Sequence, residues 1–406
     1  MASACRLPAQ EPGANLQVYL MTMGAGADID ERFGHNALWI RDTVAHTDIV
    51  YNFGTFSMGD GPLGLFMFGV RFALGPQRYW LDASDLQRTL NMYRRHQRDL
   101  RGQELNFTPA QRADIAARLA INAREENRYY RYDYFLDNCS TRVRDLLDIE
   151  LGGALKVATL GKPAEGTYRW HTRRSITNNV ALFTSIDAAF GHNADRPLDQ
   201  WGEMFLPAKV QQRVHELTVA GPDGQPEPLV KHEIPLLTIG AYAVEKQPPP
   251  WTLMFLVVGL AITGLIRLAR SPRPIALVGR LVAGAWLLLM GIGGLILIFF
   301  WVATKHWAMY ANFNLLLLSP LGLLLVGVFW RRGGSPLPPR TPRVAMFMMV
   351  SVIFGAAMAL LPGITGQDNK LIAALVALPT FSVALEALAI WNRQAAVPGL
   401  APSPEA

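Results

Sequence analysis

Cysteine is nearly absent from this sequence, which contains only Cys5 and Cys139 among its 406 residues. Two cysteines supply no disulfide framework, and they lack the close spacing of the paired thiols in zinc or redox motifs. A phosphate-binding loop and a cluster of metal ligands are also missing from the sequence. We therefore expect chemistry without a cofactor, and any thiol chemistry must rest on one of these two residues.

The beginning of the chain lacks the apolar run of a signal peptide. Residues 1–17 are mixed and polar, although Ala2-Ser3-Ala4 resembles the small residues near a cleavage site. We expect residues 1–17 to be a leader or the remnant of an export signal. The net charge of +6 would suit a nucleic-acid partner, but no zinc-finger or RNA-binding signature accompanies it. We expect no nucleic-acid partner.

Long apolar runs fill the sequence from Trp251 onward. Five of them approach the roughly 20 residues that a helix needs to cross a bilayer. They are Trp251–Leu268, Leu281–Ala303, Phe313–Trp330, Val344–Leu361 and Leu371–Trp391. The sequence therefore predicts an all-helical transmembrane domain over residues 247–392, followed by a tail at 393–406.

Arginine is distributed unevenly among the loops between these runs. The loops after the second and fourth runs carry only Lys305 and Lys370. The loops after the first and third runs carry Arg267, Arg270, Arg273 and Arg280, and Arg331, Arg332, Arg340 and Arg343. Basic loops face the cytoplasm. This pattern places residues 18–246 outside the cytoplasm and the tail inside it.

The outer half of the chain mixes strand and helix patterns. Period-two alternation predicts strands at 17–23, 32–42 and 48–56, with a short fourth strand at 78–81. Helices are predicted at 84–100 and 108–125, and Thr108 to Gln111 forms a capping box at the start of the second. Gly61–Leu74 has no clean period and suits an apolar flap or a membrane-facing loop. This half is therefore predicted to be an α+β domain.

Cys139 lies near the middle of the stretch Tyr129–Leu147. Asp137 and Asn138 are favoured N-cap residues, and a helical pattern follows them. The thiol therefore lies at the start of a helix, on the edge of its apolar face. The partial positive charge at a helix start favours thiolate over thiol, which makes Cys139 a candidate nucleophile. The alternative is a small buried residue without reactivity.

A cysteine nucleophile needs a base beside it, and the chain has eight histidines. His35 is favoured because it opens a predicted strand and because Gly34 permits close approach of a backbone or a substrate. However, the string FGHNA occurs twice, at Phe33–Ala37 and at Phe190–Ala194. His192 is therefore a rival base on sequence alone, although its surroundings are those of a loop.

Several long motifs occur in an order that resembles the Lnb family of bacterial membrane proteins. They are RFGHNALWIRD, VYNFGTF, ENRYYRYDYFLDNCSTRVRDLL, DRPLDQWGEMFLPA and NFNLLLLSPLGLLL. This family includes lipoprotein N-acyltransferases. The resemblance implies a periplasmic catalytic domain over residues 18–246, followed by spans in the bacterial inner membrane.

The periplasmic domain of that family is in turn similar to a permuted papain-like fold, as in NlpC-type peptidases and lecithin:retinol acyltransferase. In that fold a histidine on a strand precedes a cysteine at the start of a helix. The resemblance therefore implies Cys139 as the nucleophile and His35 as the base. Asn52 is a candidate to orient the imidazole, and Tyr132 or Asn138 to polarise a carbonyl. A structural role is the alternative for all three.

The function implied by the resemblance is acyl transfer. Cys139 would take an acyl chain from a membrane lipid or a diacylglyceryl lipoprotein and hold it as a thioester. It would then pass the chain to the α-amine of a lipoprotein's N-terminal cysteine. One alternative is an NlpC-like cell-wall amidase or peptidase that uses the same pair of residues with water. Five spans count against this alternative, because such a hydrolase would not need them. A non-enzymatic membrane scaffold is the third hypothesis.

Overall fold

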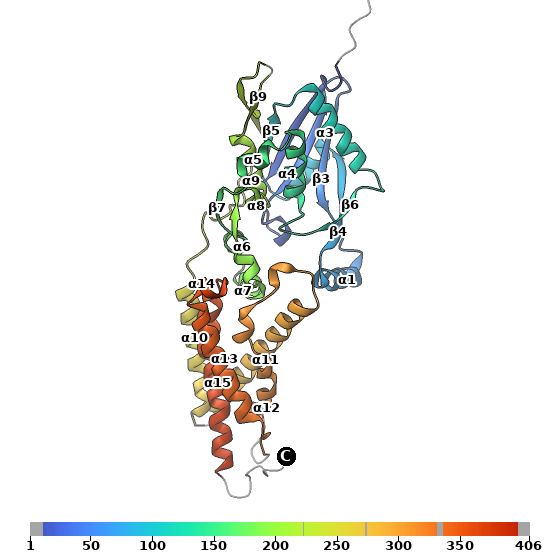
Figure 1. Cartoon of the computed structure of the whole chain (residues 1–406). Helices are drawn as coiled ribbons and strands as arrows, with labels where there is room; N and C mark the ends of the chain where they lie inside the picture. The colour runs from blue at the N-terminus through green and yellow to red at the C-terminus, as the bar shows by residue number, and fades with distance from the viewer. Residues whose placement is uncertain (1–10, 222, 273, 331–335, 397–406) are drawn as a thin grey trace, which may run out of the picture. The chain divides into compact units, whose positions relative to one another are not determined.

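The computed structural model describes residues 11–221, 223–272, 274–330 and 336–396, which form two compact units (Figure 1). The first unit comprises the chain up to Phe72, Pro76–Gly166 and Pro197–Lys246. The second comprises Ala73–Gly75, Thr167–Arg196 and the chain from Gln247 onward. Two segments before residue 247 thus belong with the apolar helices. Most of the predicted leader, with Cys5, and most of the predicted tail lie outside the described residues.

A seven-stranded antiparallel sheet forms the centre of the first unit, in the order β11-β5-β1-β2-β3-β4-β6. The strands are β1 Leu16–Met23, β2 His35–Asp42, β3 Thr47–Thr55, β4 Gln77–Asp85, β5 Leu100–Leu105, β6 Tyr129–Tyr132 and β11 Val230–Leu237. The three long predicted strands are confirmed as β1 to β3. Strand β4 is longer than predicted, and β5, β6 and β11 were not predicted. The strands β7 Pro163–Thr167 and β8 Pro197–Asp199 form a separate pair, as do β9 Thr218–Ala220 and β10 Pro226–Pro228.

Helices cover both faces of this sheet. Strand alternation sends Leu38 and Ile40 into one core and Ala37 and Trp39 into the other. The first core packs against α3 (Pro109–Asn122), α4 (Cys139–Glu150), α5 (Ala154–Thr159) and α9 (Pro207–Glu216). The second core packs against α2 (Leu86–Arg95). The four-residue helix α8 is Gln200–Glu203. The predicted α+β class is therefore confirmed.

Two local predictions had different outcomes. The capping box is confirmed, because Thr108 Oγ1 accepts from the Gln111 N–H at 3.3 Å while Gln111 Oε1 accepts from the Thr108 N–H at 2.9 Å. Gly61–Leu74, for which the sequence suited an apolar flap or a membrane-facing loop, is a helix, α1. The helix went unrecognised because apolar residues occupy its whole circumference, so the sequence shows no period of 3.6 residues.

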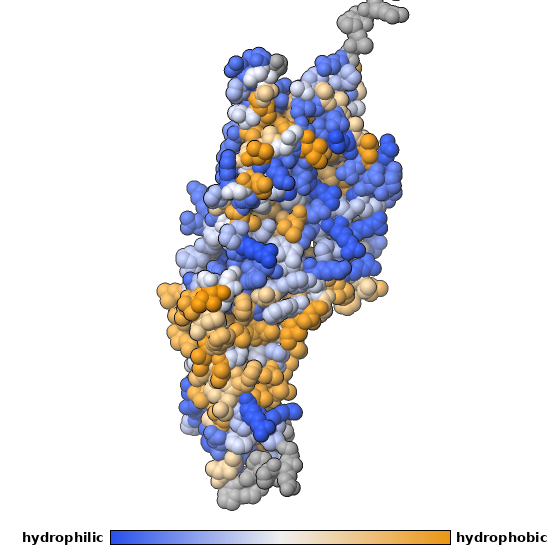
Figure 2. All heavy atoms as spheres, viewed as in Figure 1, coloured by the Kyte–Doolittle hydropathy of each residue, from blue (hydrophilic) through white to orange (hydrophobic). Residues whose placement is uncertain are grey.

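In the second unit, five of the described helices are long and apolar enough to cross a membrane, as predicted. They are Thr252–Arg270 (α10 Thr252–Arg267 and η3 Leu268–Arg270), Ile275–Val302 (α11), Phe313–Trp330, Thr341–Ala359 (α13) and Lys370–Ala395 (α15). Figure 2 shows hydrophobic side chains gathered over these helices. The shorter elements of this unit are α6 Tyr168–Ser175, α7 Val180–Ala189, η2 His192–Asp195, η4 Trp307–Met309 and α14 Pro362–Thr365.

The third span is irregular. It consists of η5 (Phe313–Leu316), η6 (Pro320–Leu325) and α12 (Val326–Trp330). A non-helical backbone within a membrane must be buried in protein and have its polar groups bonded. Ser351 Oγ supplies one such bond to the Leu316 carbonyl at 2.8 Å. Gly294 of α11 admits the irregular chain, since a Cβ atom there would lie 2.3 Å from the Leu318 oxygen.

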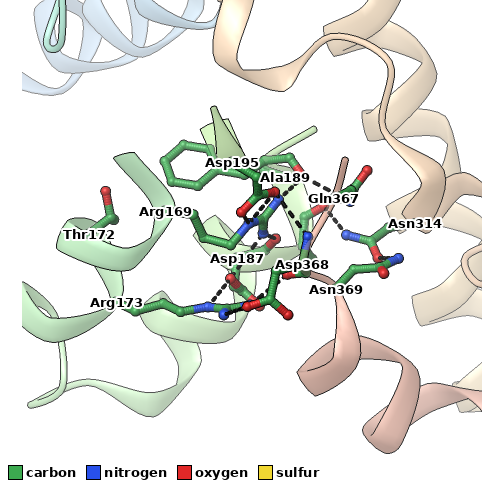
Figure 3. A network of polar contacts seen from close by, with 12 residues as sticks. Arg169, Thr172, Arg173, Asp187, Ala189, Asp195, Asn314, Gln367, Asp368 and Asn369 are labelled. Carbon is green, nitrogen blue, oxygen red and sulfur yellow. Dashed lines mark hydrogen bonds and ion pairs between the residues drawn. The ribbon is translucent and has the colours of Figure 1, made fainter. Parts of the chain in front are cut away.

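A buried network of charges ties α6 and α7 to the loop before α15 within the second unit (Figure 3). Arg169 is fully buried, with Nε 2.9 Å from both carboxylate oxygens of Asp195 and Nη1 3.0 Å from Asp187 Oδ1. Arg173 joins Asp187 at 2.7 Å to Asp368 at 2.6 Å. Arg169 and Asp187 are both fully buried, so removing one of these two partners costs about 3–5 kcal/mol, because it leaves a buried charge uncompensated. The network therefore fixes α6 and α7 to each other and to the loop before α15.

Candidate active site around Cys139

Cys139 is the first residue of α4, and only 7% of its surface is exposed. The side chain of Asn138 caps the helix by accepting from the N–H groups of Ser140 and Thr141, both at 2.9 Å. The Thr141 hydroxyl accepts in return from the Asn138 N–H at 2.8 Å. The predicted helix start is confirmed, and the thiol lies at the positive end of the helix dipole.

His35 is the first residue of β2, paired with Met23 of β1. Gly34 directly before it has a φ of +83°, which favours glycine. A Cβ atom at Gly34 would also lie 2.7 Å from the Met23 carbonyl oxygen. The prediction that Gly34 permits a close backbone approach is therefore confirmed. This turn sets the position from which the imidazole reaches the thiol.

The pKa of Cys139 reflects opposing effects. Burial raises the pKa of the thiol, but the charge of His35 and a hydrogen bond with its imidazole lower it. The Asn36 backbone N–H and the Ser140 hydroxyl, whose oxygen is 3.8 Å from the sulfur, lower it further. Together they bring the pKa down from 9.0 to about 7. A substantial fraction of Cys139 is therefore thiolate at neutral pH, as a nucleophile requires.

Gly54 makes room beside the thiol. It has a φ of +91° and lies where the β3–β4 register shifts between Asn52 and Thr55. A Cβ atom at Gly54 would be 3.6 Å from the Cys139 Cβ and 3.4 Å from a ring carbon of Tyr132. The sequence analysis did not select this residue. An isolated glycine within a strand pattern is the available signal, since it often marks a bulge or a close approach.

Two tyrosines of β6 flank this position. Burial, followed by the charge of Cys139, raises the pKa of both Tyr130 and Tyr132 well above the usual range. Both phenols are therefore protonated donors at neutral pH. The Tyr130 hydroxyl is buried without a hydrogen-bond partner among the described residues, and it is 3.8 Å from the place of a Gly54 Cβ. It is thus a donor available beside the thiol, and sequence reasoning missed it.

The other two predicted residues lie in different environments. Asn138 donates both amide hydrogens, to the carbonyls of Tyr134 at 3.0 Å and Phe205 at 2.9 Å, which leaves none for a substrate. The Asn52 amide nitrogen is 3.4 Å from Ser84 Oγ, which in turn is bonded to Thr89 of α2. Strand alternation thus turns Asn52 toward α2, away from the face that holds Cys139. Its amide oxygen has no hydrogen-bond partner in the described part of the chain, so no bond orients His35 from there.

His192, the rival base, belongs to the second unit, whereas Cys139 belongs to the first. It begins η2, and its Nε2 atom is 3.1 Å from Asn193 Oδ1. The repeated string FGHNA therefore folds in two ways, as a strand entrance at His35 and as a 3₁₀ turn at His192. His35 is the histidine whose charge and hydrogen bond lower the pKa of Cys139.

The site as a whole combines a buried thiol of lowered pKa, an imidazole bonded to it and a free phenol nearby. A thiolate and an imidazole together perform nucleophilic attack on a carbonyl, with proton transfer to and from the histidine. A hydrogen-bond donor beside the sulfur suits the oxyanion that forms on the carbonyl oxygen. The arrangement therefore fits acyl transfer through a covalent thioester.

Two family models match this chain. The Lnb N-terminal periplasmic domain matches residues 8–179, and the Lnb transmembrane domain matches residues 245–390. His35 and Cys139 both lie in the first match, and His192 lies in neither. No curated protein and no solved structure matches the chain. Together the two models cover most of the sequence and identify a membrane protein with a periplasmic domain.

Proposed function

Because the chain belongs to the Lnb family, we propose that it is a membrane-bound thiol acyltransferase that N-acylates bacterial lipoproteins. Cys139 takes an acyl chain from a membrane lipid or a diacylglyceryl lipoprotein. It then passes the chain to the α-amine of a lipoprotein's N-terminal cysteine. The observation that carries this proposal is the pairing of His35 with a thiol whose pKa is about 7 at the start of α4.

The first half of the reaction forms the thioester. The thiol proton passes to the His35 imidazole, and the Cys139 sulfur attacks the ester carbonyl of the donor lipid. A carbon–sulfur bond forms as the ester carbon–oxygen bond breaks. The leaving alkoxide takes the proton from His35 and departs as an alcohol. The helix dipole and the Asn36 N–H favour the thiolate that begins this sequence.

The second half transfers the chain to nitrogen. The free α-amine of a diacylglyceryl cysteine attacks the thioester carbonyl while His35 accepts a proton from the amine. A carbon–nitrogen bond forms, the carbon–sulfur bond breaks, and the thiolate is restored. An amide is more stable than the starting ester, so the transfer runs downhill without ATP. The five spans give the enzyme access to a donor and an acceptor that are both held in the membrane.

The proposed location is the bacterial inner membrane, with the C-terminus in the cytoplasm. The arginine excess lies in the loops after the first and third spans and at the adjoining ends of the spans, and such basic regions remain on the cytoplasmic side. Arg273, Arg331 and Arg332 of these loops lie outside the described residues. The first span then runs from the periplasm inward, which agrees with the periplasmic domain that precedes it.

Tyr130 supplies the oxyanion donor in this scheme, with Tyr132 next to it. Tyr130→Phe removes only the unpartnered hydroxyl, so the transfer rate should fall about 10²-fold, as when one oxyanion donor is removed. The pH dependence of Cys139 alkylation should not change. Tyr129→Phe on the same strand is the matched control, because its hydroxyl bonds to Glu125 at 2.6 Å. Equal rates for the wild type and Tyr130→Phe would remove Tyr130 from the mechanism.

Mass spectrometry of lipoprotein N-terminal peptides tests the proposed function. The protein is expressed in cells that lack their own lipoprotein N-acylation. We expect an amide-linked acyl chain on the N-terminal cysteine, absent from cells with an empty vector. Unmodified lipoproteins from a well-expressed, membrane-inserted protein would contradict the proposal. Analysis of cell-wall muropeptides from the same cells then tests the amidase alternative.

A further inference from the structure

Helix α1, Gly61–Leu74, exposes apolar side chains around its circumference. None of its residues is buried, and Arg71 is its only charged residue. Leu63 is 72% exposed and Phe66 is 64% exposed. Leu65, Met67, Val70, Phe72 and Leu74 are also exposed. Soluble surfaces rarely leave so much apolar area on one element in water, so an apolar environment is expected to cover α1.

The chain itself indicates what covers α1. Its last residues, with Gly75, belong to the same compact unit as the five spans. Within that unit, the Leu74 carbonyl accepts a hydrogen bond from the Lys305 N–H at 3.1 Å. Lys305 follows shortly after Val302, where α11 ends. The end of α1 is thus fixed next to the end of a helix that is long and apolar enough to cross a membrane.

A row of aromatic rings runs from α1 to the active site within the first unit. Phe68 of α1 stacks on Phe56 with ring centroids 5.7 Å apart, and Phe56 is 4.8 Å from Tyr79. Tyr79 stacks on Tyr132 at 4.2 Å, and Tyr132 adjoins Gly54 beside Cys139. We call Phe68, Phe56, Tyr79 and Tyr132 the aromatic row. It joins an exposed apolar helix to a buried thiol.

We propose that α1 lies in the outer leaflet of the membrane and delivers acyl chains along the aromatic row to Cys139. The delivery part rests on the proposed acyltransferase function, whereas the membrane part does not. Arg71, in the last turn, can extend its guanidinium to the headgroups while its methylene groups stay in the apolar layer. The occupant of the exposed surface is therefore lipid, and the acyl chain to be transferred comes from that lipid.

Fluorescence quenching tests the membrane part without any activity measurement. The full-length protein, with Cys5→Ser and Cys139→Ala, carries an environment-sensitive fluorophore at Phe66→Cys in phosphatidylcholine vesicles. Lipids with a nitroxide on the acyl chain should quench it strongly. The control probe is at Val157→Cys on α5, because Val157 is an apolar residue of the first unit that is 82% exposed. Equal quenching at both sites would overturn the proposal. So would a Phe66 probe shielded from both lipid nitroxide and aqueous iodide, which would indicate a protein partner.

A charge on α1 tests the delivery part. Phe66→Asp, with Cys139 intact, should lower lipoprotein acylation about tenfold, because a charged side chain in place of Phe66 loses the favourable transfer of an aromatic ring from water to lipid. Alkylation of Cys139 by a water-soluble reagent should not change, and Val157→Asp should change neither quantity. Unchanged acylation in Phe66→Asp would overturn delivery through α1. A wild type that acylates no lipoprotein would refute the proposed function instead, while the quenching experiment would still judge the membrane part.

Discussion

Cys139→Ala and Cys139→Ser should both lose lipoprotein N-acylation, by at least ~10⁴-fold, as when the nucleophile of a covalent enzyme is removed. Alanine has no nucleophile. Serine keeps the approximate size of the side chain, but an alkoxide is far harder to form than a thiolate. The measurement is the acylation of a purified diacylglyceryl lipopeptide by enzyme in lipid vesicles, followed by mass spectrometry.

Both variants should remain folded. Cys139 is a small buried residue whose backbone, not its thiol, begins α4, and the cap comes from Asn138. Thermal unfolding of the two variants should therefore differ little from that of the wild type. A trapping experiment tests the thioester directly. A radiolabelled acyl chain should stay on the wild-type protein when no acceptor amine is present, and it should not label Cys139→Ala. A Cys139→Ala protein with full activity would refute the nucleophile and the thioester together.

His35→Ala should reduce the transfer rate by about 10²–10⁴-fold, the usual contribution of a general acid–base group. The matched control is His192→Ala, in the second copy of FGHNA, which should keep the wild-type rate. His192 lies in the other compact unit and adjoins Asn193. If His192→Ala lowered the rate strongly and His35→Ala did not, the assignment of His35 as the base would be wrong.

The pH dependence of Cys139 alkylation gives a second measurement of the same pairing. The thiolate reacts and the thiol does not, so the wild-type rate should rise with pH and reach half of its maximum near pH 7, the pKa of Cys139. In His35→Ala the burial of the thiol persists while the imidazole is gone, so the pKa should rise and the curve should move to higher pH. An identical curve in both proteins would show that His35 does not act on the thiol.

The sequence predicted the parts of this structure that depend on local signals. The capping box at Thr108 and the cap at Asn138 are contacts between near neighbours in the chain, and both are confirmed. The five spans depend only on length and apolar composition. Cys139 could be selected because its position at a helix start follows from the residues directly before it.

The features that the sequence did not predict depend on contacts between residues far apart in the chain, such as the pairing of strands. The strand β6 is only four residues long, and the sequence analysis assigned no secondary structure to these residues. Tyr130 matters because folding leaves its hydroxyl buried and unbonded, which no local pattern encodes. Asn52 was correctly placed on a strand next to β2, but its face of the sheet depends on the register with β4, where it pairs with Asp82. One residue of register decides which core a side chain enters.

The charge network of Figure 3 has a consequence for the order in which the molecule can be completed during synthesis. Arg173 precedes its partner Asp368 by 195 residues, and Asp368 emerges only with the loop before the last span. At about 5–20 residues per second, the ribosome needs on the order of 10–40 s to supply that partner. The segment around Arg169 and Arg173 can pair with Asp187 and Asp195 early, but its contact with Asp368 forms only after nearly the whole chain has been made.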